Sequence, residues 1–86
     1  MEVREAKLWI KEKIDELAAK SEAQAESRWW STRTRDGRFR LSVDIIQGRK
    51  KKEPKEDYFS EDELTKVGDP TLQGKMERRL KKWLGF

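Results

Sequence analysis

Two stretches of the chain have the spacing of amphipathic helices. The N-terminal stripe consists of Val3, Ala6, Ile10, Ile14, Leu17, Ala18, Ser21 and Ala25. Its intervals of three and four residues predict one helix over residues 2–26. The C-terminal stripe consists of Leu72, Met76, Leu80 and Trp83. It predicts a helix over residues 70–84, for which Asp69 is a suitable N-cap and Gly85 a suitable end.

The segment between these helices has the alternation of a β-hairpin. Apolar side chains from Phe39 to Ile45 alternate with polar ones, which is strand periodicity. Asp36-Gly37 suits a two-residue type I′ turn, so a hairpin is expected over residues 28–46. The predicted core face consists of Trp30, Thr32, Thr34, Phe39, Leu41, Val43 and Ile45. The exposed face consists of Trp29, Ser31, Arg33, Arg35, Arg38, Arg40, Ser42 and Asp44. A one-residue slip of register would reverse these assignments.

A basic and then acidic segment follows the hairpin. Residues 47–59 are predicted to form a loop, because Pro54 cannot occupy a helix interior or a central strand. Ser60-Glu61-Asp62-Glu63 then matches a capping box. A short helix is therefore expected over residues 61–67.

These elements predict a single α+β domain over residues 1–86, in the order α-β-β-α-α. The two-stranded antiparallel hairpin would pack on the long N-terminal and C-terminal helices. Because an isolated hairpin is marginally stable, a homodimer that joins two hairpins into a four-stranded sheet is an alternative. Leu8 and Trp9 lie off the N-terminal stripe, so they either widen the buried face or form a dimer contact.

The composition removes most enzyme classes. The 86 residues include neither cysteine nor histidine, which excludes disulfides, thiolate chemistry, the usual zinc sites and histidine general bases. No metal, cofactor or enzymatic activity is therefore expected. No apolar run, Leu8–Ile10 included, is longer than three residues, so the sequence predicts no membrane insertion and a cytoplasmic, intracellular location.

Charge is arranged along the chain in blocks of one sign. The formal net charge is +4, but residues 1–26 sum to −2, residues 27–52 to +7, residues 53–69 to −5 and residues 70–86 to +4. Such blocks need a partner of opposite sign, either within the fold or outside it. The placement of charge is thus more informative than its total.

The arginines of the hairpin are the predicted site. Opposed like charges on one strand pair repel each other, so stability does not account for them. Guanidinium groups bind phosphate and an indole stacks on bases, so the sequence predicts a non-enzymatic nucleic-acid-binding protein. The expected contacts are Trp29, Arg33, Arg35, Arg38, Arg40, Arg49, Lys50, Lys51 and Lys52. A possible second basic face consists of Lys75, Arg78, Arg79 and Lys82.

Two other interpretations remain open at this level. The acidic residues of segment 53–63 can fold back and neutralise the arginines, which would leave an ordinary solvated surface. Alternatively, the chain is an interaction or regulatory module, homodimeric or not, that binds an acidic protein surface. The sequence does not distinguish DNA from RNA.

Overall fold

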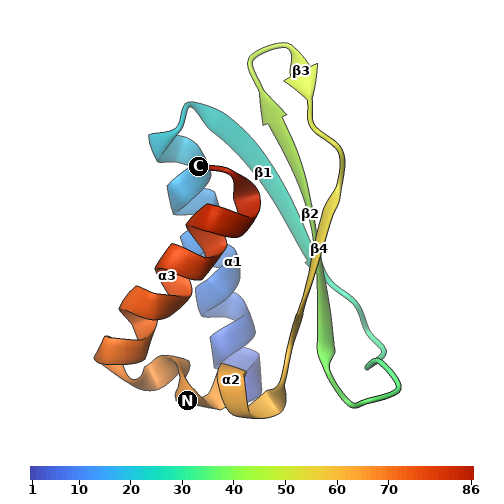
Figure 1. Ribbon diagram of the computed structural model, residues 1–86, viewed down its shortest axis with the longest axis vertical. Coiled ribbons are helices and arrows are strands. Elements are labelled where there is room, and N and C mark those ends of the chain that lie inside the picture. The colour runs from blue at the N-terminus through green and yellow to red at the C-terminus, as the bar shows by residue number, and fades with distance from the viewer.

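The computed structural model describes all 86 residues and has two layers, with long helices on one face of an antiparallel sheet (Figure 1). The elements are α1 (Val3–Lys20), β1 (Ala23–Trp29), β2 (Phe39–Gln47), β3 (Lys50–Lys51), β4 (Lys55–Phe59), α2 (Glu61–Thr65), the 3-10 turn η1 (Lys66–Gly68) and α3 (Pro70–Leu84). The α+β class is confirmed. The order α-β-β-α-α is not, because the structure has two further strands.

The first helix ends six residues before its predicted limit. Its backbone stops at Lys20, and Glu22 has a positive φ of 54°, which turns the chain back along the helix. Residues 23–29 then form β1. Ala25 fits both the helical stripe and an alternating strand, and the small side chains of Ala23 and Ala25 let α1 pack closely over β1. Their high helix propensity was misleading because tertiary packing overrides it.

β2 is the central strand of the sheet. It pairs antiparallel with β1 on one side and with β4 on the other, and its far end pairs with the two residues of β3. The predicted loop over 47–59 is therefore wrong at its end, where Lys55–Phe59 forms β4. Pro54 directly precedes this strand. Proline excludes a central strand, but it does not prevent an edge strand from starting after it.

The predicted register of the hairpin is wrong. Gly37 has the expected positive φ of 79°, but the turn closes with a bond from the Thr34 N–H to the Arg38 carbonyl, at 2.9 Å. Residues 31–33 are irregular, and Trp29 lies opposite Leu41 instead of Asp44. The difference of three positions is odd, so every side chain of β1 changes face.

The later helices follow their capping signals. The Glu63 N–H donates to Ser60 Oγ at 3.1 Å, and Glu63 accepts from the Ser60 N–H at 3.3 Å, which confirms the capping box. The predicted helix over 61–67 divides into α2 and η1. For α3 the predicted limits 70–84 are confirmed, with Asp69 as N-cap and Gly85 in the left-handed conformation.

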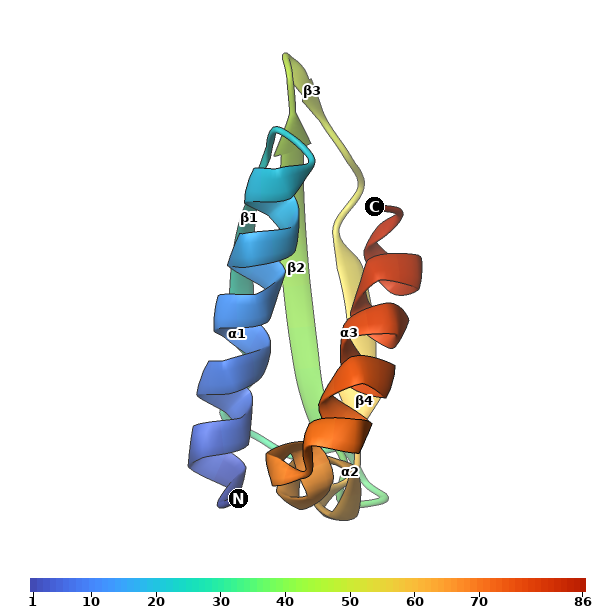
Figure 2. The same ribbon diagram turned by 90° about the vertical axis from the view of Figure 1, so that its left-hand side faces the viewer.

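The core lies between the sheet and the helices. Figure 2 shows α1 over β1 and α3 over β4. Phe39, Leu41, Val43 and Ile45 are all buried, as the alternation of β2 predicts. The opposite face of the sheet has no helix over it (Figure 1). None of the helices has the length and apolar character needed to cross a membrane.

Candidate nucleic-acid interface

The four hairpin arginines do not form one face. Arg33 and Arg35 belong to the irregular loop between β1 and β2, and only Arg40 lies within a strand. The Arg33 guanidinium stacks over the Phe39 ring, with 4.3 Å between guanidinium carbon and ring centroid, and its Nη1 is 3.8 Å from Glu61 Oε2. Arg35 is exposed and pairs with no carboxylate.

Carboxylates neutralise two further arginines of this set. Arg40 Nη2 donates to Glu56 Oε1 at 2.6 Å, and Arg38 Nε lies 2.7 Å from Asp36 Oδ2. The bond from Arg40 lowers the pKa of Glu56, and the same bond raises the pKa of Arg40. Since Glu56 and Glu61 both belong to segment 53–63, that segment does pair with the hairpin arginines in cis.

The two adjacent tryptophans occupy opposite faces from those predicted. Trp29 points inward, where its Nε1–H donates to the Lys7 carbonyl at 3.1 Å and its ring meets Phe59 edge-on at 5.6 Å between centroids. The prediction that Trp29 is exposed for stacking is therefore wrong. Trp30 is on the open face and is 38% exposed, with the Arg40 guanidinium 4.2 Å from its ring centroid. The sequence analysis anticipated Trp29 inside and Trp30 outside only as the result of a slip in the hairpin register.

Cations are crowded where α1 meets the loop. Lys7 Nζ lies 4.3 Å from the Phe39 ring centroid, and the Arg33 guanidinium carbon lies 4.3 Å from the same centroid. Burial lowers the pKa of Lys7, and the Arg33 charge lowers it further. These cations are thus held against the core, while the outer part of Arg33 approaches Glu61.

The basic run Arg49–Lys52 lies at the other end of the sheet. Gly48, with a φ of 65°, allows the tight turn between β2 and β3, and the resulting ribbon projects beyond the ends of the helices (Figure 1). Arg49, Lys50 and Lys51 are exposed, and Lys52 is half-buried. No carboxylate oxygen lies within 4.0 Å of any of these four side chains.

The C-terminal end of α3 lies at the same end of the molecule as this ribbon (Figures 1 and 2). Its last turn carries Lys82, which the sequence singled out, and Lys81, which it did not, and Arg78 of the preceding turn lines a shallow surface hollow with them. Lys55, at the start of β4, donates to the Trp83 carbonyl at 3.0 Å and so joins the group. We call this group the basic end: Arg49, Lys50, Lys51, Lys52, Lys55, Arg78, Lys81 and Lys82. None of them forms an ion pair.

The other two residues of the predicted second face lie outside the basic end. Arg79 turns toward the sheet, where it pairs with Asp57 at 3.2 Å and with Glu63, and donates to the Tyr58 carbonyl at 2.9 Å. Lys75 is exposed nearer the start of α3. Arg79 therefore connects α3 to β4 and α2.

The basic run Arg49–Lys52 and the hairpin arginines, which the sequence assigns to one site, lie apart in the structure. Arg40 lies seven residues before Gln47, where β2 ends, which is a distance of about 23 Å along the strand. On the open face between them, Glu26 lies directly opposite Asp44. A polyanion that followed this face would meet both carboxylates, so the two basic groups are separate.

Only half of the predicted dimer contact is exposed. Leu8 is 57% exposed on α1, whereas Trp9 packs against the core and has Lys13 Nζ 5.4 Å from its ring centroid. Of the two roles expected for Trp9, this packing fits the one in which Trp9 widens the buried face of α1.

No family model matches the chain, and neither a curated protein nor a solved structure matches it. Function therefore has to be inferred from the charges and contacts described above. The residues that bear most directly on function are the cations that the fold leaves without an acidic partner.

Proposed function

We propose that this chain is a small, non-enzymatic nucleic-acid-binding protein that holds the phosphate backbone with its basic end. One observation carries the proposal: eight cationic side chains on the β2–β3 ribbon, the start of β4 and the C-terminal half of α3 have no carboxylate within 4.0 Å. Seven of the other thirteen lysines and arginines contact carboxylates, among them Arg38, Arg40 and Arg79. The proposal keeps the predicted class of function but moves its main site.

A phosphate backbone supplies what the basic end lacks. Unpaired like charges repel one another, and a polyanion relieves that repulsion while releasing its condensed counterions. Arg49 at the turn suits bidentate phosphate binding, and the lysines act as point charges. A two-stranded ribbon also fits the major groove of B-DNA, which is about 12 Å wide. The cations at the end of α3 would then face the phosphates flanking that groove.

An acidic protein surface is the alternative partner for the same cations. Its separate carboxylates hold no condensed counterion layer comparable to that of a nucleic acid, so binding would depend less steeply on salt. The salt dependence of affinity therefore separates the two partners.

The proposal is tested by fluorescence anisotropy with short duplex DNA, duplex RNA and single-stranded DNA at several salt concentrations. We expect binding whose log–log slope approaches about −0.9 per phosphate contact for duplex DNA, or about −0.7 for single strands. Comparison of the three probes shows which nucleic acid the protein prefers. Absence of binding to all three at about 50 mM salt would overturn the proposal.

A further inference from the structure

The edge of the sheet formed by β1 is open. β1 pairs only with β2, and the bond from the Trp30 N–H to the Arg40 carbonyl continues that ladder beyond β1. In an antiparallel ladder the backbone groups of alternate residues point to opposite sides. Even-numbered residues of β1 therefore bond to β2, and the N–H and C=O groups of Ala23, Ala25, Ser27 and Trp29 point to the free edge.

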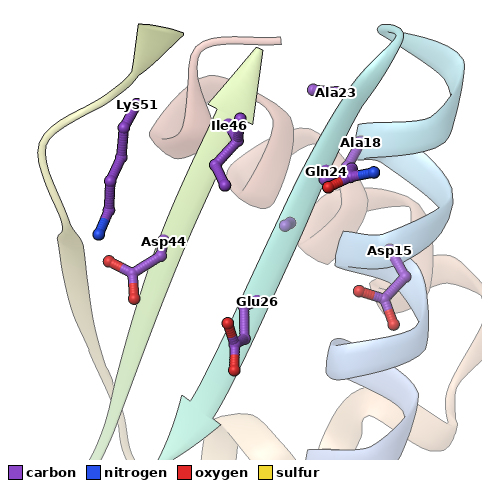
Figure 3. Close-up of a pocket in the computed structure, with 9 residues that line it drawn as sticks. Asp15, Ala18, Ala23, Gln24, Glu26, Asp44, Ile46 and Lys51 are labelled. Atoms are coloured by element: carbon purple, nitrogen blue, oxygen red, sulfur yellow. The ribbon is translucent and has the colours of Figure 1, made fainter. Parts of the chain in front are cut away.

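A hollow of about 550 Å³ adjoins this edge (Figure 3). Its lining includes the alanines Ala18, Ala23 and Ala25, from α1 and β1, together with Ile46 of β2. Ile46 is 44% exposed. Small side chains along an edge leave the backbone accessible, and they give an incoming strand an apolar surface.

The rim of the hollow is acidic. Asp15, Glu26 and Asp44 line it, and none of the three has a cation within 4.0 Å. Glu26 and Asp44 are also directly opposed like charges. The single basic lining residue, Lys51, lies on the Asp44 side, away from Glu26 and Asp15 (Figure 3).

We infer that β1 docks an extended peptide segment of another protein, rich in lysine or arginine, as an additional antiparallel strand. The free backbone groups supply main-chain hydrogen bonds, and the unpaired carboxylates select cationic side chains. This inference does not rest on the proposed nucleic-acid function, although Lys51 belongs both to the basic end and to the lining of the hollow.

A second copy of this chain does not fit the same edge by pairing β1 with β1. Adjacent strands lie about 4.8 Å apart, whereas packed helices need about 8 to 10 Å between their axes. Because α1 lies over β1 (Figure 2), a paired copy would bring its own α1 too close to the first one. A lone strand carries no such helix.

The register assigns a face to each peptide residue. Residues opposite Ala23 and Ala25 share their inward face, so small apolar side chains suit these positions and their backbone groups bond to β1. The intervening residues point to the open face, where a lysine lies beside Glu26. An alternating lysine and valine peptide therefore matches the edge, with its valine N–H groups facing β1.

NMR titration of the full chain with a capped (Lys-Val)4 peptide tests this inference. We expect saturable amide shifts in β1 and near Asp15, and about fivefold weaker binding to Glu26→Gln. Methylation of the backbone amide nitrogens of the valines should abolish binding. Methylation of the backbone amide nitrogens of the lysines should preserve it. This ligand-side comparison does not depend on the folding of any variant.

Three results of the peptide titrations would overturn the inference. They are the absence of saturable shifts in β1, equal binding of both methylated isomers, and equal binding of a (Glu-Val)4 peptide. As a check on the protein side, Ala25→Pro removes an N–H that the ladder does not use, so the sheet should persist while binding is lost. Retained binding in a folded Ala25→Pro protein would contradict docking on this edge.

Discussion

Arg40 and Glu56 form a charge-assisted hydrogen bond of 2.6 Å on the open face of the sheet. Because this carboxylate occupies the guanidinium, we predict that Arg40→Gln leaves nucleic-acid affinity nearly unchanged. Lys50→Gln removes the same charge from the basic end, and it should make the log–log salt slope shallower by about 0.9 for duplex DNA. Anisotropy titrations of the two variants provide the comparison. A larger effect from Arg40→Gln would place the site back on the hairpin arginines.

Arg79 should matter for stability far more than its neighbour Arg78. Arg79 bonds Asp57, Glu63 and the Tyr58 carbonyl, whereas Arg78 is exposed and unpaired. We expect Arg79→Met to lower the free energy of unfolding by about 1 to 2 kcal/mol, since it removes several partly buried hydrogen bonds. Arg78→Met should change it by less than about 0.5 kcal/mol. Urea denaturation measures both, and equal losses would mean that the Arg79 contacts contribute nothing specific.

The same contact predicts part of the acid sensitivity of the fold. Burial tends to raise the pKa of Glu63, but the bonds from Arg79 and the Ser60 N–H outweigh it and hold that pKa below its usual value. The stabilisation is present above the unfolded pKa, about 4.3, and is lost as pH falls through the folded pKa. Glu63→Gln should therefore be less stable than wild type at pH 7, by at most about 1 kcal/mol.

The difference in free energy of unfolding between wild type and Glu63→Gln should shrink as pH falls from about 5 to 2, because Glu63 becomes protonated in both the folded and the unfolded chain. Denaturant titrations at a series of pH values follow it. Glutamine keeps the capping interaction with the Ser60 N–H, so the comparison isolates the charge. A difference that stays constant down to pH 2 would show that the Glu63 charge is not responsible.

Trp29 and Trp30 provide a direct test of the register. Trp29 packs against Phe59 and bonds to the Lys7 carbonyl, so Trp29→Ala should cost about 3 kcal/mol of stability. Trp30 lies on the open face, and Trp30→Ala should cost much less. Denaturation midpoints and the shift in tryptophan emission report both variants. The reverse order of effects would support the register expected from a two-residue turn.

Signals that act within a few residues predicted their elements well. The alternation of β2, the Ser60 capping box and the limits of α3 depend on local geometry, and the structure confirms them. Two expectations, the end of the first helix and the register of the hairpin, were wrong because contacts between residues far apart in the sequence determine them. Ala23 and Ala25 suit a helix until α1 covers them as a strand, and one additional turn residue with an irregular segment after Trp30 shifts the register by three positions.

The site was less predictable than the fold, because pairing between charges depends on the third dimension. β4 brings Glu56 beside Arg40, and α2 brings Glu61 toward Arg33. Neither of these two contacts can be deduced from the sequence while residues 47–59 are predicted to be a loop. The charge of the Arg49–Lys52 run was visible in the sequence, but its lack of acidic partners and its position at the same end of the molecule as the last turn of α3 were not.

The central claim is that unpaired cations at the basic end, and not the paired hairpin arginines, hold a nucleic acid. Two double variants with equal charge changes test it: Arg49→Gln with Lys50→Gln, and Arg33→Gln with Arg38→Gln. In salt-dependent anisotropy titrations with duplex DNA, the first should make the log–log slope shallower by about 1.8, while the second leaves it close to wild type. Equal losses, or a larger loss in the Arg33 and Arg38 variant, would contradict the account.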